Sequence, residues 1–419
     1  MVFKRRLLVV LSSCVALASS YAAVDIQRVS SLAALSSPHW AIADWSGYGL
    51  NTPISLVAHQ AVEPAMPASI TKLLTAYVVM QSIADARPSQ QLSLQTKLIV
   101  SELATRQEGT RVGYRAGETI TVQDALQAML AISGNDAAWA LAEAVSGDTP
   151  TFVVRMNEVS KQLKLKHSRW LNPHGLSDSE HLSSASDLML LAYRLWNDFP
   201  AVRPWLSVKQ YTWNGVTQSN RNGLLYRDKT VDGLKTGHTT AAGYNLAVTS
   251  KLPVRVGDEL YHWRLTTVVL GAASAQAREA DTTTLLAWAR QHYTVSRLRV
   301  KGESLGQQWL PDAANSAELR LLESLCVTLP ASADLSRVRY TLKTMDAFSS
   351  QTAQSAQTAV KAGEQVGHLL AFYNPSIGNN PSANQLVGQA PIYTTQAIER
   401  ASWWVLTWRR LKSNILFWM

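Results

Sequence analysis

Between about Ala65 and Tyr293 the chain alternates segments that have helical patterning with segments that have strand patterning. Ser69 to Ala84 is an apolar run without Gly or Pro that follows two prolines, which is typical of a helix starting after a turn. The other predicted elements are a mostly helical stretch at 122–145 interrupted at 133–135, two adjacent strands at 243–251 and 263–270, and a closing helix at 278–293. This order predicts a mixed α/β (α+β) domain.

The pattern changes after Tyr293. Residues 298–301 and 338–342 alternate apolar with polar side chains, which predicts strands of a half-solvated sheet. Two polar stretches, at 349–358 and 374–384, predict loops. At roughly 100–200 residues per domain, a chain of 419 residues suggests two or three domains. We therefore expect a large α/β domain over 23–292 and a small, mostly-β domain over 293–393.

The N-terminus has three cations at positions 4–6 and no acid, then a short apolar stretch and small residues that end at Ala22. This pattern predicts a secretory signal peptide, with residues 1–22 removed from the mature chain. One alternative is a buried N-terminal helix. The other is lipoprotein cleavage at Cys14, which is disfavoured because the apolar run continues beyond it. Without Cys14, Cys326 is the one cysteine of the mature chain, and its apolar neighbours predict a core position and no internal disulfide.

Residues 397–419 have helical periodicity with an apolar face. At 100° per residue that face holds Ala397, Ala401, Trp404, Trp408, Leu411, Ile415 and Trp418. Arg409 and Arg410 lie away from this face, and four tryptophans fall within the last 17 residues. Tryptophan and arginine in a short amphipathic helix suit the headgroup region of an anionic bilayer. We expect 394–419 to be a membrane-anchor helix, and a terminal helix packed on the protein's own core is the alternative.

The formal net charge of +9 is concentrated at the two ends of the chain. Residues 1–22 hold three cations without an acid, and residues 397–419 hold four cations against one acid. Between the two ends the acidic and basic residues nearly cancel, so the chain has no basic surface for nucleic acid, and nucleic acid is excluded as a partner. No apolar run of about 20 residues follows the N-terminus, so an ordinary spanning helix in the mature chain is excluded as well.

Ser69 and Lys72 lie three residues apart in the first predicted helix, so both side chains share one face, one turn apart. A serine hydroxyl is a weak nucleophile that needs a base. A lysine can serve where burial and nearby cations lower its pKa. The Ser-x-x-Lys pair alone is common by chance, and Lys72 alone is equally compatible with a solvated helix residue.

Two further motifs follow in order. Ser133-Gly134-Asn135 supplies a second hydroxyl and an amide. Lys235-Thr236-Gly237 supplies a cation, a hydroxyl and a glycine that lets a substrate backbone approach an edge strand. The ordered triplet Ser-x-x-Lys, Ser-x-Asn, Lys-Thr-Gly is the signature of serine acyl enzymes that react with penicillin.

On these motifs the chain resembles a low-molecular-mass penicillin-binding protein of the serine-type D-alanyl-D-alanine carboxypeptidase family. Supporting stretches are 220–225, 231–239, 242–246 and 278–280. The resemblance is strong over about 40–293 and loose in the predicted β domain. It implies a penicillin-binding/serine β-lactamase-like transpeptidase domain, followed by a small mostly-β domain and a C-terminal amphipathic helix. It also implies a periplasmic protein attached peripherally to the inner (cytoplasmic) membrane.

The resemblance further implies roles for individual residues. Ser69 would attack the carbonyl between the two terminal D-alanines and Lys72 would take its proton, while Ser133 with Lys235 could relay a proton to the leaving amine. The backbone N–H groups of Ser69 and His238 would form the oxyanion hole. Substrate contacts would come from Asn135, Lys235, Thr236, Gly237, His238 and Arg221. No cofactor or metal is needed, and no His, Cys and Asp cluster has ligand spacing. His174 lies where the family has a loop over the site, and a contact there and a simple turn role both stay open.

The implied function is removal of the terminal D-alanine from peptidoglycan pentapeptide stems, with β-lactam antibiotics as covalent inhibitors. A β-lactamase is disfavoured, because Ser168 occupies the place where the well-known serine lactamases have a glutamate. An endopeptidase that cuts cross-links shares the catalytic core, but such relatives usually lack the β domain and the anchor. A non-catalytic wall-binding or morphology protein is the remaining alternative, against which the intact motif residues argue.

Overall fold

The computed structural model describes residues 32–46, 50, 52–85, 92–345, 359–375, 384–402 and 404–406. The predicted signal peptide with Cys14, the loop at 349–358 and most of the predicted anchor helix lie outside these residues. Within the described part of the chain, no helix is long and apolar enough to cross a membrane.

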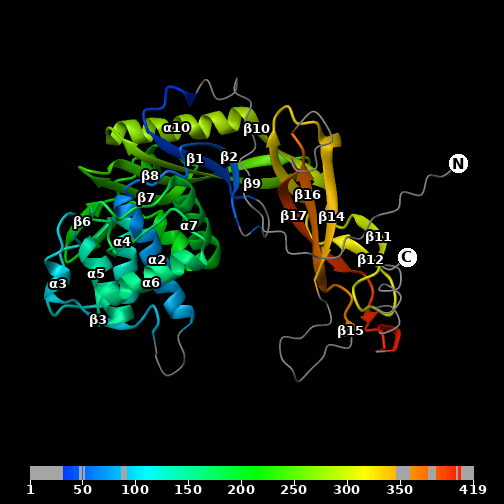
Figure 1. Ribbon diagram of the computed structural model, residues 1–419, viewed down its shortest axis with the longest axis horizontal. Helices are drawn as coiled ribbons and strands as arrows, with labels where there is room; N and C mark the ends of the chain where they lie inside the picture. The colour runs from blue at the N-terminus through cyan, green and yellow to red at the C-terminus, as the bar shows by residue number, and fades with distance from the viewer. Residues whose placement is uncertain are drawn as a thin grey trace.

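Five antiparallel strands form the central sheet of the larger domain, in the order β2-β1-β9-β8-β7 (Figure 1). They are β1 (His39–Asp44), β2 (Ile54–His59), β7 (Val231–Thr239), β8 (Gly243–Val256) and β9 (Glu259–Ala272). The Lys235-Thr236-Gly237 motif lies on β7, and β7 is an edge strand of the sheet, as the sequence predicts.

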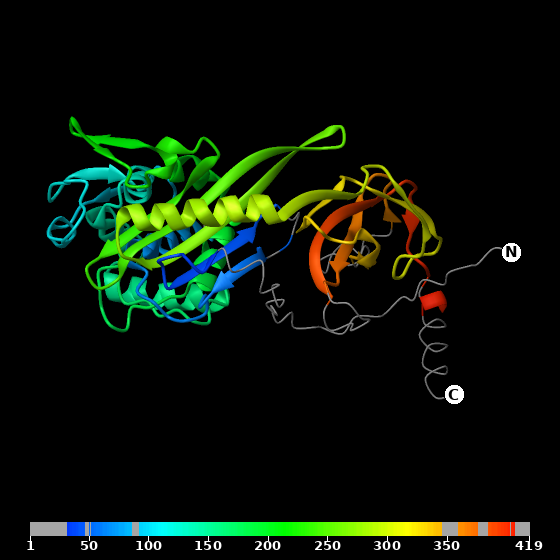
Figure 2. The same cartoon turned by 90° about the horizontal axis from the view of Figure 1, so that it is seen from above.

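Helices cover both faces of this sheet (Figures 1 and 2). α10 (Ala275–His292) packs on one face, over a core that includes Trp40 and Ile42 of β1. The alternate residues of the same strand, Ala41 and Ala43, face a second core on the other side. This period of two is the geometry of a strand that is buried on both faces. The helices on that second side are α2 (Lys72–Ala84), α4 (Val122–Ala131), α5 (Asn135–Ser146), α6 (Thr149–Gln162) and α7 (Ala185–Asp198).

Short elements lie between these helices and strands along the chain. They are η2 (Ala68–Thr71), β3 (Lys97–Ile99), α3 (Glu102–Thr105), β4 (Thr119–Thr121), η3 (Pro200–Val202), α8 (Arg203–Leu206), β5 (Gln210–Trp213), β6 (Val216–Ser219) and α9 (Leu224–Arg227).

The predicted elements of the large domain are present, with some shifted boundaries. The helix predicted at 69–84 consists of η2 followed by α2, and the stretch at 122–145 is two helices broken at 132–134. β8 and β9 continue beyond the predicted ends as one long hairpin. The helix predicted from 278 starts at Ala275, because the Ser274 hydroxyl accepts the Ala277 N–H across 3.0 Å and caps it.

The second domain is mostly β, as predicted. Its main sheet has the order β11-β12-β17-β16-β14, with two-stranded sheets β10-β13 and β15-β18 beside it. The elements are β10 (Tyr293–Arg299), β11 (Ser304–Gln308), β12 (Ala317–Leu321), β13 (Leu325–Pro330), η4 (Leu335–Arg337), β14 (Val338–Thr344), β15 (Ala359–Val360), β16 (Gln365–Tyr373), β17 (Gln385–Thr394) and β18 (Ile398–Glu399). Cys326 is buried and free, in the core position that its neighbours predict.

The start of the C-terminal helix differs from the prediction. Ile398 and Glu399 form β18, which pairs with β15, so residues 398–399 belong to the β domain and not to an anchor helix. Ala401 N–H donates to the Asp312 carbonyl across 2.8 Å, which ties the next turn of chain to the same domain. Helical periodicity at 397–401 is therefore overridden by tertiary strand pairing, and the helical conformation that the structure describes is at 404–406.

Candidate active site

Ser69 lies in the tight turn η2 directly before α2, and its side chain is half-buried. Lys72 is the first residue of α2, and its Nζ lies 2.9 Å from the Ser69 hydroxyl oxygen. The turn holds Ala68 at a φ of +47°, a conformation that costs a non-glycine residue energy and recurs at functional sites. The predicted one-turn spacing is thus realised as a direct hydrogen bond.

Lys72 is fully buried and is surrounded by cations. Burial lowers the pKa of Lys72 well below its usual value, the positive charges of Lys235 and Arg221 lower it further, and Asp136 opposes them. The ammonium also donates to the carbonyl of His174 across 2.6 Å. A buried lysine with a lowered pKa next to a serine hydroxyl is the arrangement that can supply a neutral amine as base.

Ser133 and Asn135 flank the break between α4 and α5. Ser133 has a φ of +71°, and its hydroxyl is buried without a hydrogen-bond partner among the described residues. The Asn135 amide nitrogen donates to the carbonyl of Glu108 across 2.5 Å, while its oxygen is buried and unpaired in the same part of the chain. Buried polar atoms without partners are rare, so both groups have unused hydrogen-bonding capacity for a ligand.

Gly237 brings β7 against the turn η2 that holds the candidate nucleophile Ser69, called the nucleophile turn below. A Cβ at this position would lie 2.8 Å from the Pro67 carbonyl oxygen and 3.2 Å from the Ser69 nitrogen. No side chain fits there, so the glycine allows the motif strand to approach Ser69 closely. This contact places the Lys-Thr-Gly motif beside the Ser-x-x-Lys motif.

Lys235 and Thr236 are buried, whereas His238 is exposed and stacks on Tyr244 with ring centroids 4.0 Å apart. Burial, together with the charges of Arg221 and Arg278, lowers the pKa of Lys235 to about 7. The exposed Arg221 side chain bonds the hydroxyl of Thr110. The predicted site residues Lys235, Thr236 and Arg221 therefore form a cationic region next to Lys72.

Arg278 is a component of the site to which the sequence assigned no role. It is buried, and its guanidinium donates to the carbonyls of Gly237 (3.4 Å), Asn245 (3.3 Å) and Arg221 (3.2 Å). It therefore holds the end of β7, the neighbouring strand and the Arg221 loop together. Its position in the first turn of α10 gives no local signal for these contacts.

A loop over residues 172–181 lies against the nucleophile turn through backbone and imidazole contacts. Its Gly175 has a φ of +87°, and a Cβ there would collide with the Ala68 carbonyl. The buried His181 ring bonds the Thr71 hydroxyl across 2.8 Å, and the buried His174 carbonyl receives the Lys72 bond. His174 thus contacts the site, through its backbone oxygen.

A sequence profile described as D-alanyl-D-alanine carboxypeptidase, peptidase family S11, matches residues 35–274. That range holds all the predicted motif residues. The chain belongs to this family. The carboxypeptidase DacD of Escherichia coli K12 is 34% identical over 319 residues, which cover 74% of this chain and 79% of that protein. DacD of Salmonella typhimurium is 30% identical over 406 residues, 95% of this chain and 96% of that protein.

The fold agrees with this family as well. A crystal structure of penicillin binding protein 5 from Haemophilus influenzae superposes with a TM-score of 0.65 at 25% sequence identity. The superposition covers 87% of this chain and 98% of that one. The predicted penicillin-binding fold with a mostly-β second domain is therefore confirmed.

The position that bears the glutamate in serine lactamases has no carboxylate in this member of the carboxypeptidase family. Ser168 stands there, and its hydroxyl bonds Asp187 across 2.7 Å and Ser183 across 2.8 Å.

Within the described residues no group of three or more His, Cys, Asp and Glu side chains could hold a metal ion.

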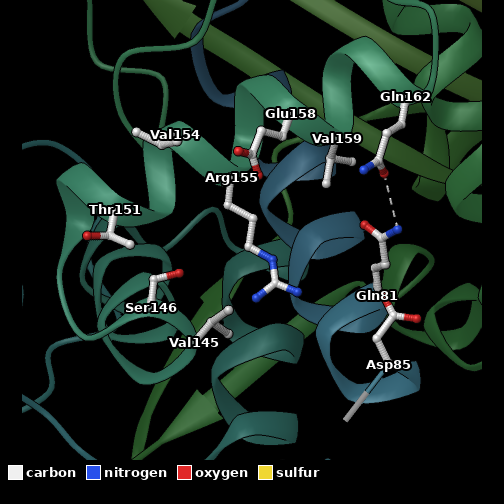
Figure 3. A pocket seen from close by; sticks show the side chains of 10 residues that line it. All are labelled: Gln81, Asp85, Val145, Ser146, Thr151, Val154, Arg155, Glu158, Val159 and Gln162. Atoms are coloured by element: carbon white, nitrogen blue, oxygen red, sulfur yellow. Dashed lines mark hydrogen bonds between the residues drawn. The ribbon is translucent and has the colours of Figure 1, made fainter.

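A cavity of about 520 Å³ lies elsewhere in the domain, between the C-terminal ends of α2 and α5 and the flank of α6 (Figure 3). Arg155 extends into it, and Gln81 bonds Gln162 across 3.4 Å at its side. None of the predicted site residues lines it. The cavity is therefore separate from the Ser69 site.

Proposed function

We propose that this protein is a serine-type D-alanyl-D-alanine carboxypeptidase that removes the terminal D-alanine from peptidoglycan pentapeptide stems. Its membership of the carboxypeptidase family supports the reaction class. The observation that carries the proposal is the 2.9 Å contact between Ser69 and the buried Lys72, on a turn that abuts the Lys-Thr-Gly strand.

In the proposed reaction, Lys72 takes the Ser69 proton as the serine oxygen forms a bond to the carbonyl between the two D-alanines. Its lowered pKa favours the neutral amine that this step needs. The backbone N–H groups of Ser69 and His238 would stabilise the oxyanion, and Ser133 with Lys235 would pass a proton to the leaving amine. The C–N bond then breaks and free D-alanine departs. Water hydrolyses the Ser69 ester and restores the enzyme.

Recognition of a free C-terminus is assigned to the cationic region. Thr236, Lys235 and Arg221 would hold the terminal carboxylate, since a carboxylate prefers charged and hydroxyl donors in a buried setting. The unpaired Asn135 oxygen would accept an N–H of the stem backbone. Gly237 lets the edge strand β7 lie against the turn that holds Ser69, and the same site would be acylated by β-lactams.

We also propose the cellular context. Residues 1–22 direct export, and the protein acts in the periplasm. Its catalytic domain spans 23–292 and is followed by a β domain over 293–393. The C-terminal segment attaches the protein to the inner-membrane surface. The pairing of β18 with β15 moves the start of that segment beyond residue 399.

The test is D-alanine release from a pentapeptide muropeptide and from a cross-linked muropeptide dimer, using the mature chain. Release of D-alanine with intact dimers supports a carboxypeptidase. Cleavage of the dimers would establish an endopeptidase, and silence on both substrates by a folded, penicillin-binding protein would contradict the enzymatic proposal.

A further inference from the structure

Lys72 is connected through His174 to a second segment of the chain that is distant in sequence. The His174 carbonyl accepts from Lys72 Nζ at 2.6 Å, and the His174 ring bonds the Gln107 side-chain oxygen at 3.0 Å through Nε2. Gln107 lies in the chain after α3, 67 residues away from His174 in sequence. Its own amide donates to the Leu103 carbonyl at 2.9 Å, which fixes the side chain to α3.

The hydrogen bonds define the tautomer of His174. Nδ1 accepts the N–H of Leu176 at 3.2 Å, so it carries no proton. Nε2 therefore carries the proton and donates it to Gln107. The ring is buried and stacks on Trp139 of α5, with centroids 6.0 Å apart and planes 18° from parallel. Both ring nitrogens of His174 are therefore hydrogen-bonded, which fixes the ring in one orientation.

Trp139 connects this ring to the same α3 segment by a second route. Its indole N–H donates to Glu143 at 2.8 Å, and Glu143 accepts the hydroxyl of Ser101 at 3.0 Å. Ser101 caps the N-terminus of α3. The His174 ring therefore lies between α3 and α5, both of which are held in fixed positions around it.

We propose that Gln107 is a positioning residue for the general base: by holding the neutral His174 ring, it fixes the carbonyl that orients Lys72 toward Ser69. This inference rests on the proposed function of Ser69 and Lys72. It adds a residue that acts on Lys72 through the backbone of another loop. A shift of the reacting groups by about 1 Å can cost up to about 100-fold in rate, so such a support has a measurable effect.

The charged surroundings of Lys72 determine the sign of the expected pH effect. Lys235 on β7, Arg221 before α9 and Asp136 on α5 act on its charge, and the charge of Lys72 acts in turn on both imidazoles of the 172–181 loop. The carbonyl of His174 stabilises the ammonium form. Loosening that carbonyl lowers the pKa of Lys72, whereas a negative charge at position 107 raises it.

The experiment compares Gln107→Met, which keeps the side-chain size but removes the acceptor, with Gln107→Glu, which keeps an acceptor and adds a charge. Gln81→Met is the matched control, because Gln81 lies near the end of α2 that is remote from Lys72 and makes an exposed side-chain bond to Gln162. Acylation by a fluorescent penicillin is followed as a function of pH, and D-alanine release gives kcat and KM. Thermal melting checks the fold of each variant.

We expect Gln107→Met to lower kcat and the acylation rate about tenfold, with KM within about twofold of the parent, because positioning and not binding is lost. The acid limb of the acylation profile should shift to lower pH in Gln107→Met and to higher pH in Gln107→Glu. The control should match the parent in both respects.

Parent-like kcat and pH limbs in both Gln107 variants would overturn the proposal, as would a loss confined to KM. If Gln107→Met does not fold, the acid limb of the acylation profile of Gln107→Glu decides. A shift to higher pH supports the proposal, and no shift or a shift to lower pH overturns it. A parent protein that is acylated by penicillin but releases no D-alanine would refute the proposed function, while the acylation profiles would still test the role of Gln107.

Discussion

Lys72 Nζ donates both to the hydroxyl of Ser69, at 2.9 Å, and to the carbonyl of His174, at 2.6 Å. The lysine is therefore held between Ser69 and a loop that is distant in sequence. Burial of its ammonium is costly, and the resulting low pKa favours the neutral amine. The pH dependence of the enzyme should report this arrangement.

A first prediction concerns Lys235, whose pKa is lowered to about 7. In the proposed reaction its protonated form would hold the substrate carboxylate, so kcat/KM should fall as the pH rises through about 7. Arg221→Gln removes a positive charge that lowers this pKa, and the falling limb should then shift to higher pH. The measurement is the pH profile of D-alanine release at low substrate concentration.

Arg169→Gln is the control for that substitution, because Arg169 is an exposed arginine paired with Glu180. Its profile should match that of the parent. A falling limb that does not move in Arg221→Gln would mean that Lys235 is not the group being titrated.

A second prediction concerns stability in acid. The pKa of the buried His181 is lowered to about 4, mainly by burial, whereas the unfolded chain takes up the proton near pH 6.5. The unfolded state thus binds more protons in this window, and the free energy of unfolding should fall as the pH drops from about 6.5 to 4. The contribution of this one group is about 3 kcal/mol.

Urea unfolding at several pH values measures the slope. His181→Gln should flatten it, because the titrating group is gone, while His262→Gln at an exposed strand position should leave it unchanged. An unaltered slope in His181→Gln would show that acid sensitivity arises elsewhere.

A third prediction concerns Gly175, which has a φ of +87° and no room for a Cβ against the Ala68 carbonyl. Gly175→Ala should destabilise the protein by about 3 kcal/mol and slow acylation, because Ala68 directly precedes the nucleophile. Gly117→Ala is the matched control: Gly117 has a φ of +80° and open space around its Cα.

Gly117→Ala should lower the free energy of unfolding by about 1 kcal/mol, because alanine is strained at a positive φ, and it should leave acylation at the parent rate. Chemical denaturation and penicillin acylation measure the two effects. Equal behaviour of the two alanine variants would contradict the close contact between the 172–181 loop and the nucleophile turn.

The sequence predicted the parts of the site that have local requirements. The sequence placed Ser69 and Lys72 one helical turn apart, the 133–135 motif at a break between helices, and Gly237 on an edge strand. The structure has all three features. Each is a property of a few consecutive residues, which is why single-sequence patterns reveal it.

The contacts between distant segments could not be predicted in this way. Arg278 bonds three carbonyls from separate parts of the chain, and carbonyls carry no residue-specific signal. β8 runs to Val256, past its predicted end at residue 251, and Pro253 lies within it opposite His262 in the long hairpin. At the C-terminus, pairing of β18 with β15 overrides the helical pattern.

The most direct test of the account is to locate the acyl group. The mature protein is incubated with a penicillin, digested with trypsin and analysed by mass spectrometry, beside Ser69→Ala. Ser69 and Ser133 fall in different tryptic peptides, residues 29–72 and 116–155. We predict a slowly hydrolysed penicilloyl group on the 29–72 peptide, absent from Ser69→Ala. An adduct on the 116–155 peptide, or rapid penicillin turnover without a stable adduct, would contradict Ser69 as the nucleophile of a carboxypeptidase.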